Sequence, residues 1–254
     1  MLSTHRFYSA NITVSSKTLS IIDPDELHHL QHVLRLKSGD ELELVSGQGL
    51  LARGTLSLVT KSRAEVKIEH VDEFPRKAGP RIVLACAFPK KAKFELILEK
   101  ATELGVDEVV PIVTERTEVV VGKKAAERKD QRFFRVVLNA CKQSRRVWFP
   151  EIHSVMPFAE ALQTFAGEPN ALFIPWLEGE RRFILDALGE ARFKNAARAI
   201  FFIGPEGDFT QNEILLAKSF GAMPVSLGQN VLKVDTAALL TISLAISILN
   251  ADKS

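Results

Sequence analysis

The strongest constraint on the fold is a change of hydrophobic period near residue 80. From Arg81 onward, short runs that are apolar throughout alternate with longer segments whose apolar residues recur every three or four positions. The short runs are typical of strands buried on both faces, and the longer segments have the spacing of one helix face. The alternation therefore predicts an α/β domain over residues 81–254, in which helices cover both faces of a parallel sheet.

The two periods also give the expected elements of this domain. Strands are expected over residues 81–88, 107–113, 151–155, 171–175, 199–203 and 223–227. Helices are expected over residues 94–104, 125–146, 157–166, 180–188, 211–220 and 236–249. The motif Thr210-x-x-Glu213 predicts a capping box at the start of the helix 211–220.

The first 73 residues follow a different pattern. The runs 41–45, 50–59 and 63–71 alternate polar and apolar residues, and the turn residues 46–49 separate the first two. A short helix is expected over residues 24–34. These features predict a small N-terminal β-barrel over residues 1–73, followed by a linker over residues 74–80 that contains two prolines and a glycine.

The composition suits a globular protein, and its charges are unevenly placed. Of 254 residues, 25% are charged and 46% are hydrophobic, with a net charge of +2. Residues 76–93 hold six basic side chains and no acidic one, and residues 116–146 hold ten against three. Such clustering is expected of a surface that binds a polyanion, although a solvated helix surface has the same composition.

Several classes of protein are disfavoured. Two cysteines without a Cys-x-x-Cys motif, and no secretory signal, favour the cytoplasm. The apolar segment 237–249 is shorter than the about 20 residues that span a bilayer, so no membrane partner is expected. His28 and His32 have the spacing of zinc ligands but lack the glutamate and third ligand of a zinc enzyme, so no metal is expected. A serine hydrolase would need a Gly-x-Ser-x-Gly motif, which the chain lacks.

Three loops at predicted strand ends form the candidate site, because ligands of parallel sheets bind beyond the carboxyl ends of the strands. Glycines in these loops allow a ligand to approach the backbone, and Leu227, Val231 and Leu232 offer an apolar slot. No phosphate-binding glycine motif occurs. The candidate binding residues are Pro175, Trp176 and Leu177 in the first loop, Gly204, Pro205, Glu206 and Gly207 in the second, and Leu227, Gly228, Asn230, Val231 and Leu232 in the third.

These loops also carry a family resemblance. Gly204-Pro205-Glu206-Gly207, Leu227-Gly228, Val231-Leu232 and Asp235-Thr236-Ala237 resemble the motifs of SPOUT-class methyltransferases. More narrowly, the chain resembles the bacterial 16S rRNA uracil-N3 methyltransferases over nearly its whole length. Arg6-Phe7, His28-His29-Leu30, Val33-Leu34-Arg35 and Gly39-Asp40 resemble that family's PUA-like RNA-binding barrel, and residues 100–106 and 143–146 resemble its further motifs.

The resemblance implies a function and an architecture. It implies transfer of a methyl group from S-adenosyl-L-methionine to N3 of a specific uridine in 16S rRNA, with the small ribosomal subunit as partner. It also implies a deep trefoil knot, a homodimer, and a cofactor held by the three loops. Two alternatives stay open: a different RNA target such as a ribose 2′-hydroxyl, and a non-catalytic RNA-binding or assembly protein.

Residue roles follow from the same resemblance and from the chemistry. Uracil N3 must lose a proton, which calls for a base or for a cation that stabilises the anion. The candidates are the carboxylates of Asp235 and Glu206 and the cations of Lys233 and Arg146. The candidate RNA-binding residues are Arg6, His28, Arg35, Lys90, Lys91, Arg145 and Arg146.

The chain also departs from the family pattern. The family usually has glycine at Asp208, arginine at Asn230 and Lys233, and glutamate at Asp235 and Lys142. These departures leave open the identity of the base and the exact target nucleotide. The sequence also does not distinguish free rRNA from the assembled subunit as the substrate.

Overall fold

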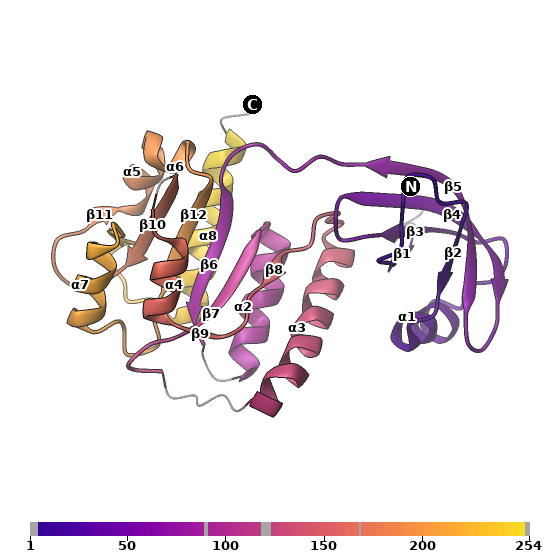
Figure 1. The fold of residues 1–254 in the computed structure, drawn as a ribbon, viewed down its shortest axis with the longest axis horizontal. Coiled ribbons are helices and arrows are strands. Elements are labelled where there is room, and N and C mark those ends of the chain that lie inside the picture. The colour runs from indigo at the N-terminus through magenta and orange to yellow at the C-terminus, as the bar shows by residue number, and fades with distance from the viewer. Residues whose placement is uncertain (1–4, 89–90, 118–122, 168, 252–254) are drawn as a thin grey trace. The chain divides into compact units, whose positions relative to one another are not determined.

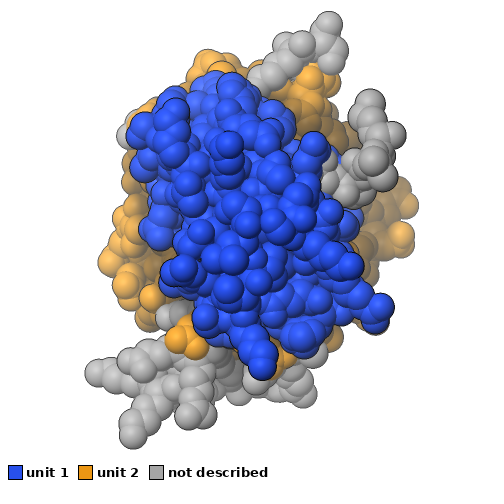
Figure 2. All heavy atoms as spheres, turned by 90° about the vertical axis from the view of Figure 1, so that its right-hand side faces the viewer, with its two compact units in different colours: residues 1–77, 141–149 blue, residues 78–140, 150–254 orange. Residues whose placement is uncertain are grey.

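The protein divides into two compact units. A computed structural model describes residues 5–88, 91–117, 123–167 and 169–251, with the backbone alone for residues 91–92 and 123–130. Residues 1–77 and 141–149 form the first unit, and residues 78–140 and 150–254 form the second (Figure 2). Segment 141–149 therefore belongs with the N-terminal residues, which the pattern of periods did not indicate. The boundaries of separately folding domains stay a prediction.

The first unit contains one mixed sheet around its own core. The described strands pair in the order β1-β3-β4-β5-β2; β1 and β3 are parallel and the other pairs are antiparallel. The strands are β1 (His5–Tyr8), β2 (Thr18–Ile21), β3 (Glu41–Val45), β4 (Leu50–Val59) and β5 (Ala64–Glu73). Phe7, Leu30, Leu42 and Leu44 are fully buried in its core. The three predicted strands are present, whereas closure into a barrel stays a prediction, since β1 and β2 do not pair among the described residues.

The predicted helix 24–34 is present with a change of winding. Helix α1 (Pro24–His28) begins at Asp23, whose carboxylate accepts hydrogen bonds from the amides of Asp25 and Glu26 at 3.0 Å each. It continues as the π-helix η1 (His29–Val33), in which the amide of Leu34 bonds to the carbonyl of His29 at 2.9 Å. Hydrophobic spacing over so few residues does not distinguish these two windings.

Segment 141–149 is held to the first unit by an ion pair. The Lys142 ammonium donates to Glu26 Oε1 at 2.6 Å, and Glu26 Oε2 accepts from the amide of Tyr8 at 3.0 Å. Glu26 is buried, so removing either partner would leave a charge without compensation. The ion pair with Glu26 explains why a lysine stands at position 142, where the family usually has glutamate.

Backbone pairing fixes the end of the same segment. The amide of Gly49 bonds to the carbonyl of Val147, and the amide of Phe149 to the carbonyl of Gly47, both at 2.9 Å. Both glycines have positive φ, and a Cβ on Gly49 would lie 2.6 Å from the Trp148 ring. The predicted turn 46–49 is therefore also the site where this segment docks.

The second unit contains the predicted parallel sheet (Figure 1). Its strands pair in the order β11-β13-β10-β12-β6-β7-β8, β9 adds to β7, and every pair is parallel. The strands are β6 (Arg81–Ala87), β7 (Glu108–Val113), β8 (Glu151–Ile152), β9 (Met156–Pro157), β10 (Asn170–Pro175), β11 (Arg182–Phe183), β12 (Arg198–Ile203) and β13 (Met223–Ser226). The α/β class with a parallel sheet is confirmed.

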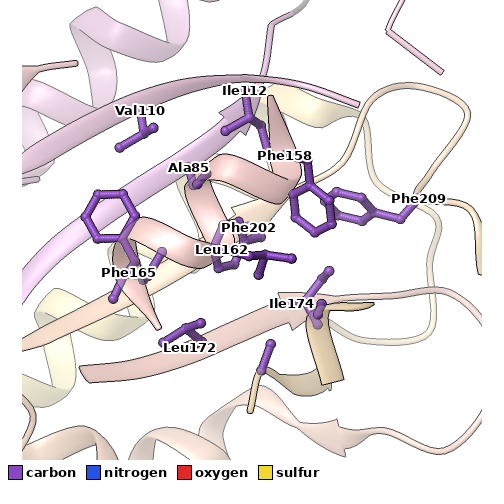
Figure 3. Packing of buried hydrophobic residues seen from close by; sticks show 14 of the residues in the cluster. Ala85, Val110, Ile112, Phe158, Leu162, Phe165, Leu172, Ile174, Phe202 and Phe209 are labelled. Carbon is purple, nitrogen blue, oxygen red and sulfur yellow. The ribbon is translucent and has the colours of Figure 1, made fainter. Parts of the chain in front are cut away.

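Helices cover both faces of this sheet because alternate strand residues point to opposite sides. Leu172 and Ile174 pack against α4 (Figure 3) and belong to one buried cluster with Ile214 and Ala217 of α7. Phe173 stacks on Phe201 and meets Phe193 of α6. On the side opposite α4 and α7, α8 contacts α2, α5, β6 and β12. The helices are α2 (Lys91–Leu104), α3 (Lys123–Gln143), α4 (Phe158–Phe165), α5 (Ile184–Gly189), α6 (Ala191–Lys194), α7 (Gln211–Ser219) and α8 (Val234–Ala251).

Two predicted elements differ from the structure. The expected helix 180–188 begins as β11, because Arg182 and Phe183 extend the sheet by pairing with Val225 and Ser226, and α5 starts only at Ile184. The expected strand 151–155 is shorter and is followed by β9, so β7 pairs first with one and then with the other. Sheet-edge pairing depends on a partner distant in sequence, which local periodicity cannot show.

Helix α8 corrects an expectation about length. The segment 237–249 was expected to be too short for a bilayer, but α8 spans 18 residues with a mean hydropathy of 1.7. By length and composition alone it is long enough to cross a membrane, a test that core helices of other proteins also pass. Its buried residues are Val234, Ala238, Thr241, Ile242 and Ala245.

A buried carboxylate lies at the amino ends of the central strands. Glu108 of β7 is 1% exposed, accepts from Arg198 at 2.8 Å, and pairs with Arg81 at 3.2 Å and His153 at 2.8 Å. Burial raises the pKa of Glu108, but the hydrogen bonds from His153 and Arg198 and the charges of Arg81 and Arg198 outweigh burial and lower the pKa to about 2. The ionised carboxylate therefore joins the starts of β6, β7 and β12.

We predict that Glu108→Gln lowers the free energy of unfolding by about 3 kcal/mol at pH 7, because the pKa of this carboxyl is depressed in the folded protein. Its contribution is present above the ordinary pKa of 4.5 and is lost as the pH falls toward 2. The difference from the unmodified protein should therefore shrink over that interval, as measured by urea denaturation. Glu151→Gln, at a side chain 59% exposed, is the control and should change stability by less than about 1 kcal/mol.

Candidate functional site

The three predicted loops meet at one pocket in the second unit. It encloses about 640 Å³ of empty space, part of it open to solvent, at the carboxyl ends of β10, β12 and β13. Every candidate binding residue from the sequence lines it except Gly207. The lining residues that were not predicted are Arg181, Ile203, Asp208, Ser226, Val234 and Ala237.

Hydrogen bonds tie the loops to one another. The amide of Trp176 donates to the carbonyl of Val225 at 3.1 Å, which joins the end of β10 to β13. The amide of Leu177 donates to Asp208 Oδ2 at 3.3 Å, which joins the first loop to the second. The Arg116 guanidinium donates to the carbonyl of Gly207, which joins the second loop to the end of β7. The pocket wall is therefore held together by the protein's own contacts.

The predicted capping box is confirmed, and its glutamate also binds a second segment of the chain. Thr210 accepts from the amide of Glu213 at 3.3 Å, and Glu213 Oε2 accepts from the amide of Thr210 at 2.8 Å. Glu213 is buried, and its second oxygen accepts from the amide of Glu115 at 2.9 Å. One carboxylate thus fixes both the start of α7 and the segment after β7.

Glycine is favoured at different loop positions for different structural reasons. A Cβ on Gly204 would lie 3.0 Å from the Phe209 ring, and one on Gly207 would lie 3.3 Å from Arg116. At Gly228 a Cβ would meet nothing within 4 Å, but φ is +130°, a conformation that L side chains rarely adopt. Packing and backbone conformation, as well as room for a ligand, therefore favour glycine at these positions.

The charged candidates are distributed unevenly around the pocket. Glu206 lines it, but its side chain is 56% exposed and pairs with Lys93 of α2 at 3.1 Å. Lys233 is exposed and does not line the pocket. Asp235 lies in the first turn of α8, where its buried Oδ1 has no hydrogen-bond partner among the described residues. Arg146 belongs to the first unit.

Asp208 is, with Arg181, one of two charged pocket residues that were not predicted from the sequence. Its φ of 60° lies in the left-handed region, and its Oδ1 accepts from the amide of Phe209 at 2.8 Å. Burial raises the pKa of Asp208, while the amides of Phe209 and Leu177 and the charge of Arg116 oppose that change. The one sequence feature that pointed to Asp208 was that the family usually has glycine at this position.

The RNA-binding candidates fall into three groups. His28, Arg35 and Arg145 are exposed in the first unit, and Arg146 is half-buried there. Lys90 lies outside the described residues, and the structure does not describe the Lys91 side chain. Arg6 differs from the expectation: its guanidinium is 8% exposed and pairs with Glu43 at 2.7 Å, so a structural ion pair explains this arginine better than a surface contact.

Metal and thiol chemistry find little support among the described residues. The one group of metal-ligating side chains close enough to share an ion is Glu108, Glu151 and His153, and two arginines already neutralise Glu108. Burial raises the pKa of both Cys86 and Cys141 to about 12, so neither thiol is ionised near neutral pH.

Comparison with known proteins identifies the family. A family model for the RNA methyltransferase domain matches residues 76–246, and one for the RNA methyltransferase PUA domain matches residues 22–69. The ribosomal RNA small subunit methyltransferase E of Synechocystis is 35% identical over 221 residues, which cover 87% of this chain and 69% of that protein. The chain belongs to the ribosomal RNA small subunit methyltransferase E family. The resemblance stated from the sequence is confirmed.

Solved structures agree with this assignment. The ribosomal RNA small subunit methyltransferase E from Neisseria gonorrhoeae, bound to S-adenosyl methionine, is 28% identical with a TM-score of 0.84, and the match covers 96% of this chain and 98% of that one. A putative methyltransferase from Legionella pneumophila, in complex with its bound cofactor, has the same identity and TM-score, with 99% and 98% covered. The methyltransferase E fold thus extends over both units.

We predict that Glu213→Ala lowers the free energy of unfolding by about 2 kcal/mol, because two backbone amides, those of Thr210 and Glu115, lose their acceptor. Chemical denaturation measures the change. Glu213→Gln keeps one acceptor oxygen and should lose about half as much. Equal stability of all three proteins would contradict the bridging role given to this carboxylate.

Proposed function

We propose that this protein transfers the methyl group of S-adenosylmethionine to N3 of a specific uridine in 16S rRNA. The observation that carries the proposal is a pocket formed by three tied strand-end loops in a member of the methyltransferase E family. A bound S-adenosyl methionine in the N. gonorrhoeae relative supports the choice of cofactor. Neither a ribose 2′-hydroxyl target nor a non-catalytic role has a specific observation in its favour.

The residues of the pocket fit this cofactor. Leu227, Val231 and Leu232 supply apolar surface suited to an adenine ring, and the half-exposed backbone at Gly204 can donate and accept hydrogen bonds. Arg181 and the carboxylates of Glu206 and Asp208 supply charge of both signs for an amino-acid group. The remaining candidate binding residues, Pro175, Trp176, Leu177, Pro205, Gly207 and Asn230, stay in this proposal as neighbours of the cofactor.

Catalysis in this proposal depends mainly on positioning. When bound, S-adenosylmethionine supplies a methyl group on a sulfonium, and the neutral thioether leaves without needing an acid. The hydrogen bonds between the loops restrict the directions from which the target uracil can approach that methyl group. The protein must also remove the N3 proton or stabilise the anion that its loss creates.

We assign different roles to the four catalytic candidates. Asp235 is our candidate proton acceptor, because its buried Oδ1 has no competing hydrogen bond among the described residues. Lys233 and Arg146 are candidates for stabilising the anion. Glu206 is assigned to the shape of the loop, because its ion pair with Lys93 joins the loop to α2.

RNA recognition is assigned to the first unit, where the PUA-domain match lies. The exposed side chains of His28, Arg35 and Arg145 are the proposed contacts, together with Arg146 and with Lys90 and Lys91 of the second unit. Arg145, two residues after the end of α3, adopts a φ of 58°, a conformation that costs a non-glycine residue about 1 kcal/mol. We propose 16S rRNA in the small ribosomal subunit as the partner and the cytoplasm as the location of the protein.

Two further features of the family belong to this proposal. We propose a homodimer, supported by α8, where Leu240, Leu244 and Ile248 are half-exposed along an apolar helix. Leu244→Arg should then yield a monomer in sedimentation equilibrium, and an unmodified protein that is already monomeric would contradict the dimer.

We also propose the trefoil knot, in which α8 follows a threaded loop. A crystal structure with an unthreaded chain would contradict it.

The proposed function predicts a methylation that can be mapped. With purified protein and labelled S-adenosylmethionine, 16S rRNA from a strain lacking this methyltransferase should gain one methyl group on one uridine, at N3. Nuclease digestion and mass spectrometry locate that group. Small subunits and deproteinised rRNA should be compared as substrates, since the proposal names the subunit.

The controls separate the proposal from its alternatives. Gly204→Val should abolish labelling, because Gly204 lines the pocket and a side chain at this position would crowd the Phe209 ring, which lies 3.0 Å from the place of a Cβ. Asp235→Asn should lower the methylation rate without comparable loss of cofactor affinity in calorimetry. A methyl group on a ribose would overturn the uridine target, and failure of the unmodified protein to bind S-adenosylmethionine would overturn the enzyme itself.

A further inference from the structure

Asp208 stands in a backbone conformation that favours glycine. Its φ is 60°, and only two other non-glycine residues in the described chain have positive φ. Aspartate tolerates this region better than most residues, yet glycine occupies it at no steric cost. The side chain therefore needs a reason of its own at this position.

The contacts of Asp208 give part of that reason. Its two carboxylate oxygens accept from the amides of Phe209 and Leu177, at 2.8 and 3.3 Å, and so join the loops after β12 and β10. Two neutral donors, one of them at a long distance, do not neutralise a carboxylate. Asp208 forms no ion pair with any lysine or arginine that the structure describes.

The surroundings of Asp208 leave its charge without a close counterion. The residue is half-buried and lines the pocket. Arg116 is near enough to favour the ionised form, but its guanidinium donates to the carbonyl of Gly207. Glu178 acts in the opposite sense, and burial raises the pKa of Asp208 overall. A cation that enters the pocket would lower the free-energy cost of keeping this carboxylate ionised.

We propose that Asp208 binds the positive charge of S-adenosylmethionine and makes the pocket selective for a cationic ligand. This inference rests on the proposed function and adds a specificity-determining residue to it. The cofactor carries two positive charges, the α-ammonium group and the sulfonium. Either charge would give Asp208 the counterion that the protein itself does not provide.

Calorimetry with three ligands tests this inference. S-adenosylmethionine carries both charges, S-adenosylhomocysteine keeps only the ammonium, and 5′-methylthioadenosine has neither. Asp208→Asn keeps the shape of the side chain and tolerates the same φ, and Asp208→Gly relieves the backbone while removing the carboxylate. Glu178→Gln removes a neighbouring charge that does not line the pocket and is the matched control.

The expected result is a loss that follows the charge of the ligand. Both Asp208 variants should weaken S-adenosylmethionine roughly tenfold or more, the range for losing a charged hydrogen bond, while 5′-methylthioadenosine changes less than about twofold. Equal weakening of S-adenosylhomocysteine assigns the contact to the ammonium, and weakening of S-adenosylmethionine alone assigns it to the sulfonium.

Three results would overturn the inference. Equal weakening of all three ligands would show that Asp208 only holds the loops together. No weakening in either variant, or an equal effect of Glu178→Gln, would remove its role in recognition. If the unmodified protein binds none of the ligands, the proposed function fails instead. Thermal melting of each variant identifies any that unfolds, and Asp208→Gly, whose backbone is unstrained, then carries the test.

Discussion

Parallel pairing of β10, β12 and β13 is the constraint on which the pocket depends. Strands that run in the same direction end at the same edge of a sheet, so three loops distant in sequence begin side by side. The amide of Trp176 then joins β10 to β13, and Asp208 joins the loop after β10 to the loop after β12. At the opposite edge, Glu108 joins the amino ends of β6, β7 and β12 by charge. Backbone geometry brings the loops together, and a few polar side chains hold them in place.

The position of the pocket was predictable because it follows from hydrophobic period and chain direction. Apolar runs indicated the strands, and the rule that ligands bind beyond their carboxyl ends selected the three loops. Family motifs at Gly204-Pro205-Glu206-Gly207 and Leu227-Gly228 then gave the chemistry. The capping box at Thr210 was predictable for a similar reason, since both of its partners lie within four residues.

Features that depend on distant partners were not predictable. In the sequence Arg6 resembles a free basic residue, but its partner Glu43 lies 37 positions away and both side chains are only 8% exposed. Asp208 was noted as a departure, while its contact with Leu177 and its φ required the fold. Segment 141–149 belongs to the first unit through Glu26 and the loop at Gly47, and no local pattern indicates those contacts. Pairing with a distant residue therefore decides whether a charged side chain is part of a structural ion pair or is available for binding.

The place of segment 141–149 has a consequence for how the protein can be divided. The chain passes between the two units after residue 77, after residue 140 and after residue 149, rather than through one linker. A fragment that stops at residue 73 would keep the buried Glu26 carboxylate but lose the Lys142 ammonium that neutralises it. It would also remove the hydrogen-bond partners of the Gly47 carbonyl and the Gly49 amide, which are the amide of Phe149 and the carbonyl of Val147. Residues 1–73 alone therefore lack part of the first unit, and exchanging that unit between relatives would require segment 141–149 to move with it.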